Sequence, residues 1–213
     1  MNGMTINGKH TFRDLGLKLK SYKISPAKAI EKKIKVPGMD GALDVSEYTG
    51  EVLFEERSFE AKFDFASKDA IKKEKKLSDI QNELNGVKAK IYLDTDPSSY
   101  YEGRLAVEYD PKNIVYTELT IKSKFYPYKL KKDITKVTKT IKQQGTVNCR
   151  NLRKTVIPKI TCNANMNLTF GNITASLRSG TSIVPEVRFK QGDNVVECKG
   201  NGTITFEYQE GGF

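Results

Sequence analysis

Carboxylates are the residues of this chain that come closest to a catalytic arrangement. They occur as close pairs at three places: Asp40 with Asp44, Glu55 with Glu56, and Asp94 with Asp96. A glycosidase needs two carboxyl groups about 5 Å or about 6.5–9.5 Å apart across a cleft, which sequence spacing cannot establish. The stretch after Asp94 also lacks the glycine and terminal glutamate of a 12-residue calcium loop. A plain turn is therefore favoured at Asp94–Pro97.

Other catalytic machinery is sparse. His10 is the only histidine, tryptophan is absent, and three cysteines lie far apart at Cys149, Cys162 and Cys198. A structural zinc site needs about four soft ligands, and the sequence contains no nucleophile elbow, P-loop or dinucleotide-binding glycine motif. We therefore expect no enzymatic activity, no cofactor, no metal, and three reduced, partly buried thiols.

The positive charge of the chain is concentrated toward its C-terminal part. The formal net charge is +10, and residues 131–213 hold 13 basic side chains against 6 acidic ones. Lys131–Lys159 alone carries nine bases with Asp133 as its one acid. Such a block could bind nucleic acid or an acidic partner. Because no aromatic residues are interleaved in it for base stacking, a solvated strand face and connector is the favoured interpretation.

Glycine-pinned turns dominate the first fifty residues. Asn7-Gly8 is a strong hairpin signal, and Val36–Gly50 contains Pro37-Gly38 and Asp40-Gly41. Proline presets φ and glycine accepts positive φ, so both dipeptides favour turns. A chain that begins in this way and has little catalytic machinery is typical of a shaped building block.

The N-terminal part reads as strands interrupted by one helix. Alternating apolar residues predict a strand over Phe59–Phe65. Helical spacing follows over Ala70–Leu84, after a capping signal at Ser67–Asp69 and before a stop at Asn85-Gly86. Further strands are predicted over Val87–Leu93, Tyr100–Tyr109 and Val115–Phe125, with turns at Asp94–Ser99 and Lys112-Asn113.

From about Leu130 the pattern changes to short strands separated by turns. These strands are predicted over Ile157–Cys162, Leu168–Phe170, Ile173–Leu177, Pro185–Phe189, Val195–Cys198 and Thr203–Tyr208. Such spacing is typical of an antiparallel sandwich. We therefore expect a mainly β chain, in which an α+β domain with one helix (residues 1–130) precedes a small antiparallel β-sandwich (residues 131–213). No apolar run approaches the roughly 20 residues needed to span a bilayer, and no signal peptide is evident, so we expect synthesis in the cytoplasm and no membrane insertion.

Several motifs, in this order and spacing, resemble one family of phage proteins. Ile6–Lys9 with Phe12–Gly16, and the turn Val36–Asp44, are similar to the beginning of distal tail (Dit) proteins of long-tailed, non-contractile phages. A helix ahead of Tyr100-Tyr101-x-x-Arg104 follows as in that family. Near the C-terminus, Ile157-Pro158, Phe170–Asn172, Gly200–Phe206 and Tyr208–Gly211 resemble its galectin-like sandwich.

The resemblance implies a virion structural protein at the tip of a phage tail, within the baseplate. Six copies would form a ring through the N-terminal domain, with the galectin-like sandwich outside it. The ring would contact the tail tube protein, the central tail-tip hub or tail-associated lysin, and in many relatives the receptor-binding protein used in host attachment. DNA would only pass through. The carbohydrate-binding modules that longer relatives insert are not visible here.

The turn sequences suggest which positions serve the fold or the ring contact. These are Phe12, Arg13, Asp14, Met39, Asp40 and Asp44. We expect Asp40 and Asp44 to accept backbone N–H bonds or to form ion pairs. Residues 1–130 hold 23 basic and 20 acidic side chains, a balance that suits pairing between copies.

Two other functions compete with an architectural one. A sugar-binding module for host wall polysaccharide would use Asn163, Asn165, Asn172 and Arg178, although Phe170 is the nearest aromatic. A nucleic-acid binder would use Lys131–Lys159, and its affinity would fall steeply with salt.

Overall fold

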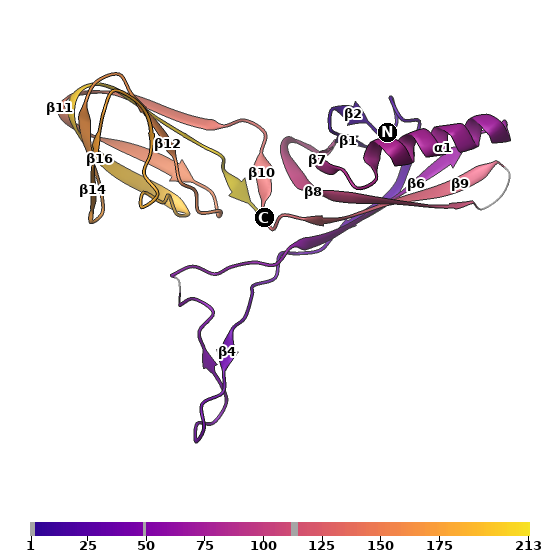
Figure 1. Cartoon of the computed structure of the whole chain (residues 1–213), viewed down its shortest axis with the longest axis horizontal. Helices are drawn as coiled ribbons and strands as arrows, with labels where there is room; N and C mark the ends of the chain where they lie inside the picture. Colours follow the sequence, from indigo (N-terminus) through magenta and orange to yellow (C-terminus); the bar gives the residue numbers. More distant parts are fainter. Residues whose placement is uncertain (1–2, 49, 112–114) are drawn as a thin grey trace. The chain divides into compact units, whose positions relative to one another are not determined.

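The computed structural model describes residues 3–48, 50–111 and 115–213. The chain forms two compact units: residues up to Lys129 together with Phe213, and residues 130–212 (Figure 1). Each unit has its own hydrophobic core.

An antiparallel sheet forms the body of the N-terminal unit. Its strands are β1 (Met4–Ile6), β2 (Lys9–His10), β3 (Lys18–Ile24), β6 (Arg57–Ala66), β7 (Lys88–Leu93), β8 (Asp96–Pro111) and β9 (Tyr116–Phe125). They lie in the order β2-β1-β7-β8-β9-β6-β3. Two short strands, β4 (Lys33–Ile34) and β5 (Leu43–Asp44), pair with each other and belong to no other sheet.

The predicted helix is confirmed as α1 (Ala70–Leu84). It lies along one face of the sheet (Figure 1) and buries Lys73, Leu77, Ile80 and Leu84, one stripe of its surface. The Asp69 carboxylate accepts a hydrogen bond from the Lys72 backbone N–H at 3.1 Å, which satisfies a free donor of the first turn. Every second side chain of β6 is buried in the core of this unit: Phe59, Ala61, Phe63 and Phe65.

The turns of the N-terminal unit follow the sequence closely, with one correction. Asn7 and Gly8 adopt φ values of 46° and 87° between β1 and β2, as the hairpin prediction required. The turn predicted over Asp94–Ser99 is too long, because β8 begins at Asp96, which pairs with Leu93. The turn predicted at Lys112-Asn113 lies outside the described residues.

One strand, β16, organises the C-terminal unit. The strands of its sheet are β11 (Thr135–Asn151), β12 (Lys159–Cys162), β13 (Met166–Phe170), β14 (Ile173–Leu177), β15 (Gly180–Ile183) and β16 (Gly192–Tyr208). Two further short strands, β10 (Lys129–Lys131) and β17 (Gly211–Gly212), pair with each other and lie outside this sheet. β11 pairs with β16 along its whole length, whereas β13 pairs with residues 197–200 of β16 and β12 with residues 204–207. β14 and β15 extend the sheet beyond β13 and β12.

Two glycines let β16 change partners. A Cβ on Gly200 would lie 3.0 Å from the Asn165 carbonyl oxygen, and one on Gly202 would lie 2.4 Å from the Asn163 side-chain oxygen. Their φ values of 139° and 154° also lie where L residues are strained. Glycine is therefore required where the β13 pairing ends and the β12 pairing begins.

Three expectations for the C-terminal part are wrong in detail. The glycines at 200 and 202 do not divide two strands, because β11 holds β16 in continuous register past them. Pro185–Phe189 is not a strand, since a Val187–Val184 backbone bond closes a turn there and only Phe189 bridges to Val156. The connector expected after residue 131 is mostly the 17-residue strand β11.

The predicted fold class is confirmed. The chain is mainly β with one helix among the described residues, and an N-terminal sheet with that helix precedes an antiparallel C-terminal sheet. The described helix is too short and too polar to cross a bilayer.

Candidate interaction surfaces

A hydrogen-bond network fixes the N-terminal turn that contains Phe12, Arg13 and Asp14. His10 is buried, and its Nδ1 accepts from the backbone N–H groups of Phe12 and Arg13, both at 3.1 Å. The proton of the neutral ring is therefore on Nε2, which donates to the Asp94 carboxylate at 3.0 Å. The Asp14 carboxylate closes the turn by accepting from the His10 N–H at 2.7 Å. Asp14 thus holds the fold locally, whereas Phe12 and Arg13 present exposed side chains.

Asp94 links this turn to the strand beside it. Its carboxylate also accepts the Gly3 backbone N–H at 2.8 Å. Burial raises the pKa of Asp94, but the hydrogen bonds from His10 and Gly3 outweigh it, so the pKa lies below its ordinary value. The folded structure therefore favours the ionised form of the Asp94 carboxyl, which accepts both hydrogen bonds.

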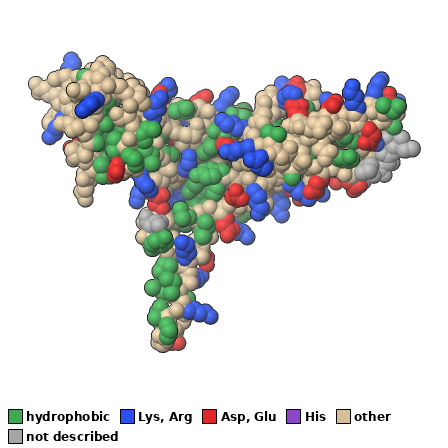
Figure 2. Space-filling view, viewed as in Figure 1, with side chains coloured by type: hydrophobic (Ala, Val, Ile, Leu, Met, Phe, Trp, Pro, Cys, Tyr) green, Lys and Arg blue, Asp and Glu red, His purple; other side chains and the backbone are tan. Residues whose placement is uncertain are grey.

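A long hairpin, which we call the arm (residues 26–56), carries the largest group of exposed apolar side chains described in the N-terminal unit. Backbone bonds hold its two sides together, including Ile30 N–H to the Leu53 carbonyl and Val45 N–H to the Lys32 carbonyl, both 2.8 Å. Its exposed large apolar side chains are 41% to 72% accessible to solvent: Ile34, Val36, Met39, Leu43, Tyr48 and Leu53. Figure 2 shows hydrophobic side chains gathered along it. Such an apolar surface is typical of a protein–protein contact.

The predicted residues Met39, Asp40 and Asp44 all lie in the arm. Met39 is 47% exposed and Asp40 is also exposed. Asp44 accepts from the Ser46 backbone N–H at 2.9 Å and from its hydroxyl at 2.5 Å. Those bonds lower the pKa of the Asp44 carboxyl. Asp44 therefore shapes its own turn, as an N–H acceptor; whether these three residues contact another copy stays a prediction.

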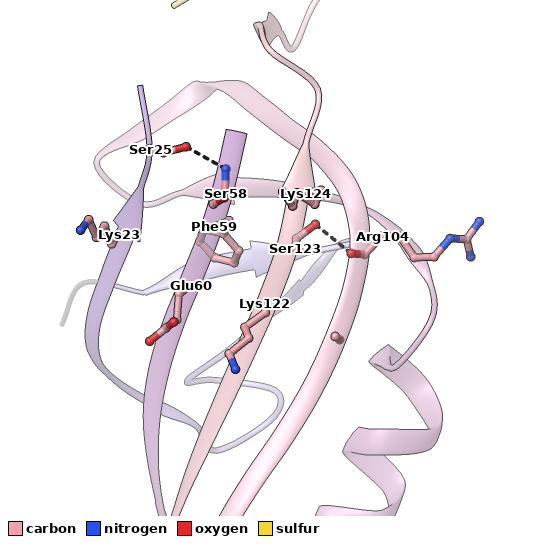
Figure 3. A pocket seen from close by; sticks show the side chains of 10 residues that line it. Lys23, Ser25, Ser58, Phe59, Glu60, Arg104, Lys122, Ser123 and Lys124 are labelled. Carbon is pink, nitrogen blue, oxygen red and sulfur yellow. Dashed lines mark hydrogen bonds between the residues drawn. The ribbon is translucent and has the colours of Figure 1, made fainter. Parts of the chain in front are cut away.

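A shallow hollow of about 540 Å³ lies on the sheet of the N-terminal unit (Figure 3). Its lining comes mainly from neighbouring strands β3, β6, β9 and β8, and although most of its residues are polar, the surface that they expose there is mostly apolar. The Arg104 side chain points away from it and donates to the Gly86 carbonyl. Lys122 is paired with Glu108 at 2.7 Å, and Ser123 donates to the Arg104 carbonyl at 2.9 Å. No hydrogen bond among the described residues joins a serine of the hollow to one of its lysines or to a carboxylate, so the geometry shows no activated nucleophile there.

Lysines and carboxylates lie beside one another on the same sheet and form ion pairs. Lys20 lies 2.9 Å from Glu118 and 3.8 Å from Asp64, and Lys62 lies 3.7 Å from Glu60. Exposed pairs of this kind contribute little to stability. They do give the sheet a surface of both charges, which suits contact with another protein.

Three of the nine bases in the block Lys131–Lys159 form ion pairs within their own unit among the described residues. Lys136 and Lys159 both contact Glu207, at 2.6 Å and 3.4 Å. Lys131 lies 3.0 Å from the buried Glu210, and Lys139 donates to the Thr146 carbonyl at 2.6 Å. This arrangement favours the solvated strand face over a nucleic-acid site.

The structure separates the four predicted sugar-binding residues. The side-chain oxygen of Asn163 accepts a hydrogen bond from the Thr203 backbone N–H at 2.7 Å. Asn172 lies exposed in the turn between β13 and β14. Asn165 and Arg178 lie together in a hollow of about 570 Å³ on the C-terminal unit. Only this pair shares a candidate site.

Sequence reasoning missed three polar side chains of that hollow: Asn167, Ser176 and Lys199. Asn167 pairs with Ser176 across the β13–β14 hairpin and with Lys199 on β16. The first pairing follows from the Gly171-Asn172 turn, because a tight turn fixes the register of its strands. The second is long-range and has no local signal.

The three cysteines are free and buried. Burial raises the pKa of Cys149 to about 12 and that of Cys198 to about 11. Both thiols are therefore protonated and unreactive at neutral pH.

Comparison with solved structures gives a match over nearly the whole chain. No family model matches the chain, and no curated protein matches its sequence. Among solved structures, the chain is similar to the Dit (gp 19.1) protein of phage SPP1, described as a paradigm of the hub adsorption apparatus in phages that infect Gram-positive bacteria. The TM-score is 0.72 at 13% sequence identity, over 98% of this chain and 99% of that chain. The resemblance predicted from the sequence is thus confirmed as a shared fold spanning both units.

Proposed function

We propose that the chain is a structural hub protein of a phage tail tip, with no catalytic activity. The observation that carries this proposal is the match to SPP1 Dit over nearly the full length of both chains. Agreement over two successive units is more specific than one shared sheet, because both the N-terminal sheet with its helix and the C-terminal sheet must correspond in order. Fold alone does not dictate function, so the surfaces must also suit assembly.

The surfaces of the N-terminal unit suit repeated self-association. The arm exposes six large apolar side chains on a thin hairpin, and such side chains lose water favourably when another subunit covers them. The sheet offers charges of both signs, and a head-to-tail contact needs two complementary patches on each copy. We infer a homo-hexameric ring formed by residues 1–130, the arm of each copy lying on the next.

The ring would join the tail tube protein on one side and the tail-tip hub or tail-associated lysin on the other. The unit over residues 131–213 would lie outside the ring as a galectin-like module, near the receptor-binding protein. Phe12, Arg13 and Met39 are the exposed residues that we assign to contacts between subunits.

Electron microscopy of the purified full-length protein tests this function. We expect six-fold rings, alone or with the co-purified tail tube protein. A Met39→Ser/Leu43→Ser variant should remain monomeric with an unchanged melting temperature, because both side chains are already exposed. Ile71→Ser is the matched control, since Ile71 is 83% exposed on α1, outside the arm. A wild-type chain that never assembles with itself or a tail protein would contradict the proposal, as would equal loss of rings in the control.

A further inference from the structure

The hollow on the C-terminal unit, which we call the donor hollow, has the features of a ligand site. It is lined from β13, the end of β14 and β16, and its functional groups belong to Asn165, Asn167, Ser176, Arg178 and Lys199. Its volume of about 570 Å³ falls within the range of small-ligand sites. It is larger than one phosphate group and can hold a phosphate with part of a sugar or polyol.

Hydrogen bonds within the hollow occupy the side-chain oxygens of its two asparagines and leave their NH₂ groups without a partner in the described part of the chain. The side-chain oxygen of Asn165 accepts from the Ser179 backbone N–H at 3.0 Å. The side-chain oxygen of Asn167 accepts from the Ser176 hydroxyl at 2.9 Å. Each amide therefore keeps its NH₂ group for a ligand.

The cations of the hollow add further donors. Arg178 and Lys199 are exposed, and neither side chain forms an ion pair or hydrogen bond within the described part of the chain. The lining contains no carboxylate. Lys136 and Lys159, by contrast, share Glu207 on the same unit. Two uncompensated cations beside two donating amides form a surface that recognises acceptor-rich anions.

We propose that the donor hollow binds the phosphodiester groups of a phosphate-bearing polysaccharide. Arg178 and Lys199 contact the phosphate oxygens, and the amides of Asn165 and Asn167 donate to phosphate or neighbouring hydroxyl oxygens. The lining contains no aromatic side chain, so it offers no platform for stacking bases, which favours a polysaccharide over a nucleic acid. This ligand goes beyond the architectural role and does not depend on ring formation.

Calorimetric titration of the full-length protein with a glycerol phosphate oligomer tests the site. Arg178→Gln and Lys199→Gln should each weaken binding about 10-fold or more, the equivalent of losing one hydrogen bond to a charged group. Asn167→Asp should abolish binding, because it places a negative charge where a donor stood while keeping the Ser176 bond possible. Lys132→Gln removes the same charge from an exposed site outside the hollow and should change affinity less than about twofold.

Three results would overturn the proposal. The oligomer could fail to bind the wild-type protein, or Lys132→Gln could weaken binding as much as Arg178→Gln, which would indicate general charge attraction. A single-stranded DNA oligonucleotide could bind more tightly than the oligomer and lose affinity in the same variants, which would assign the hollow to nucleic acid. Melting temperatures within a degree or two of wild type confirm that each variant is folded, and these measurements give the same answer whether or not rings form.

Discussion

The hydrogen bonds of His10 allow the loss of stability in a His10→Ala variant to be predicted. His10→Ala removes an acceptor shared by two backbone N–H groups and the donor to Asp94. The bond to the carboxylate contributes about 1.5–3 kcal/mol and a neutral bond about 1 kcal/mol. With one bond to the carboxylate and two neutral bonds lost, we expect the free energy of unfolding to fall by about 3.5–5 kcal/mol.

A second substitution separates the two sides of the ring. His10→Asn keeps an oxygen close to the position of Nδ1, so it can still accept from Phe12 and Arg13, but it is too short to reach Asp94. It should cost about 1.5–3 kcal/mol, less than alanine. Urea unfolding followed by circular dichroism measures both values. Equal losses in the two variants, or a loss below about 0.5 kcal/mol in His10→Ala, would refute the assigned hydrogen-bond roles.

Three further outcomes follow from the structure. The pKa of Asp94 is lowered in the folded state, so its contribution to stability is present above pH about 4 and is lost below it. The Asp94→Asn variant lacks this titrating group and should therefore lose less stability than wild type between about pH 4 and pH 2. Thermal unfolding measured across this pH range checks the difference. Gly103→Ala should destabilise by about 1–3 kcal/mol or more in urea unfolding, since its Cβ would lie 2.4 Å from both the Lys124 carbonyl oxygen and the Ser123 hydroxyl. Cys149, with its pKa raised to about 12, should react with a thiol reagent at pH about 8 only after unfolding.

Local patterns in the sequence were enough for most of the N-terminal unit. The helix over Ala70–Leu84 was predictable because one stripe, a capping aspartate and a glycine stop all agreed. Even Lys73, which breaks the apolar pattern, is buried with that stripe. The strand at Phe59–Phe65 was predictable because alternation alone identifies a half-buried strand.

Long-range pairing explains what the sequence could not show. The strand β11 is rich in lysine, threonine and glutamine, so its strand character depends on pairing with β16, whose residues lie 41 to 73 positions further along the chain. Gly200 and Gly202 resembled a turn locally, but they are sites of close approach between strands. The donor hollow depends on the same pairing, because it brings Lys199 beside Asn167.

The central position of β16 also governs when the C-terminal unit can form during synthesis. Strands β11, β12 and β13 all hydrogen-bond to β16 directly, and they precede it in the chain. While the ribosome is still translating residues 152–191, β11 has no partner and its apolar residues have no core to enter. A chain that ends before residue 192 would therefore have an unfolded C-terminal segment. In the full chain, this unit can fold only after β16 has left the ribosomal exit tunnel.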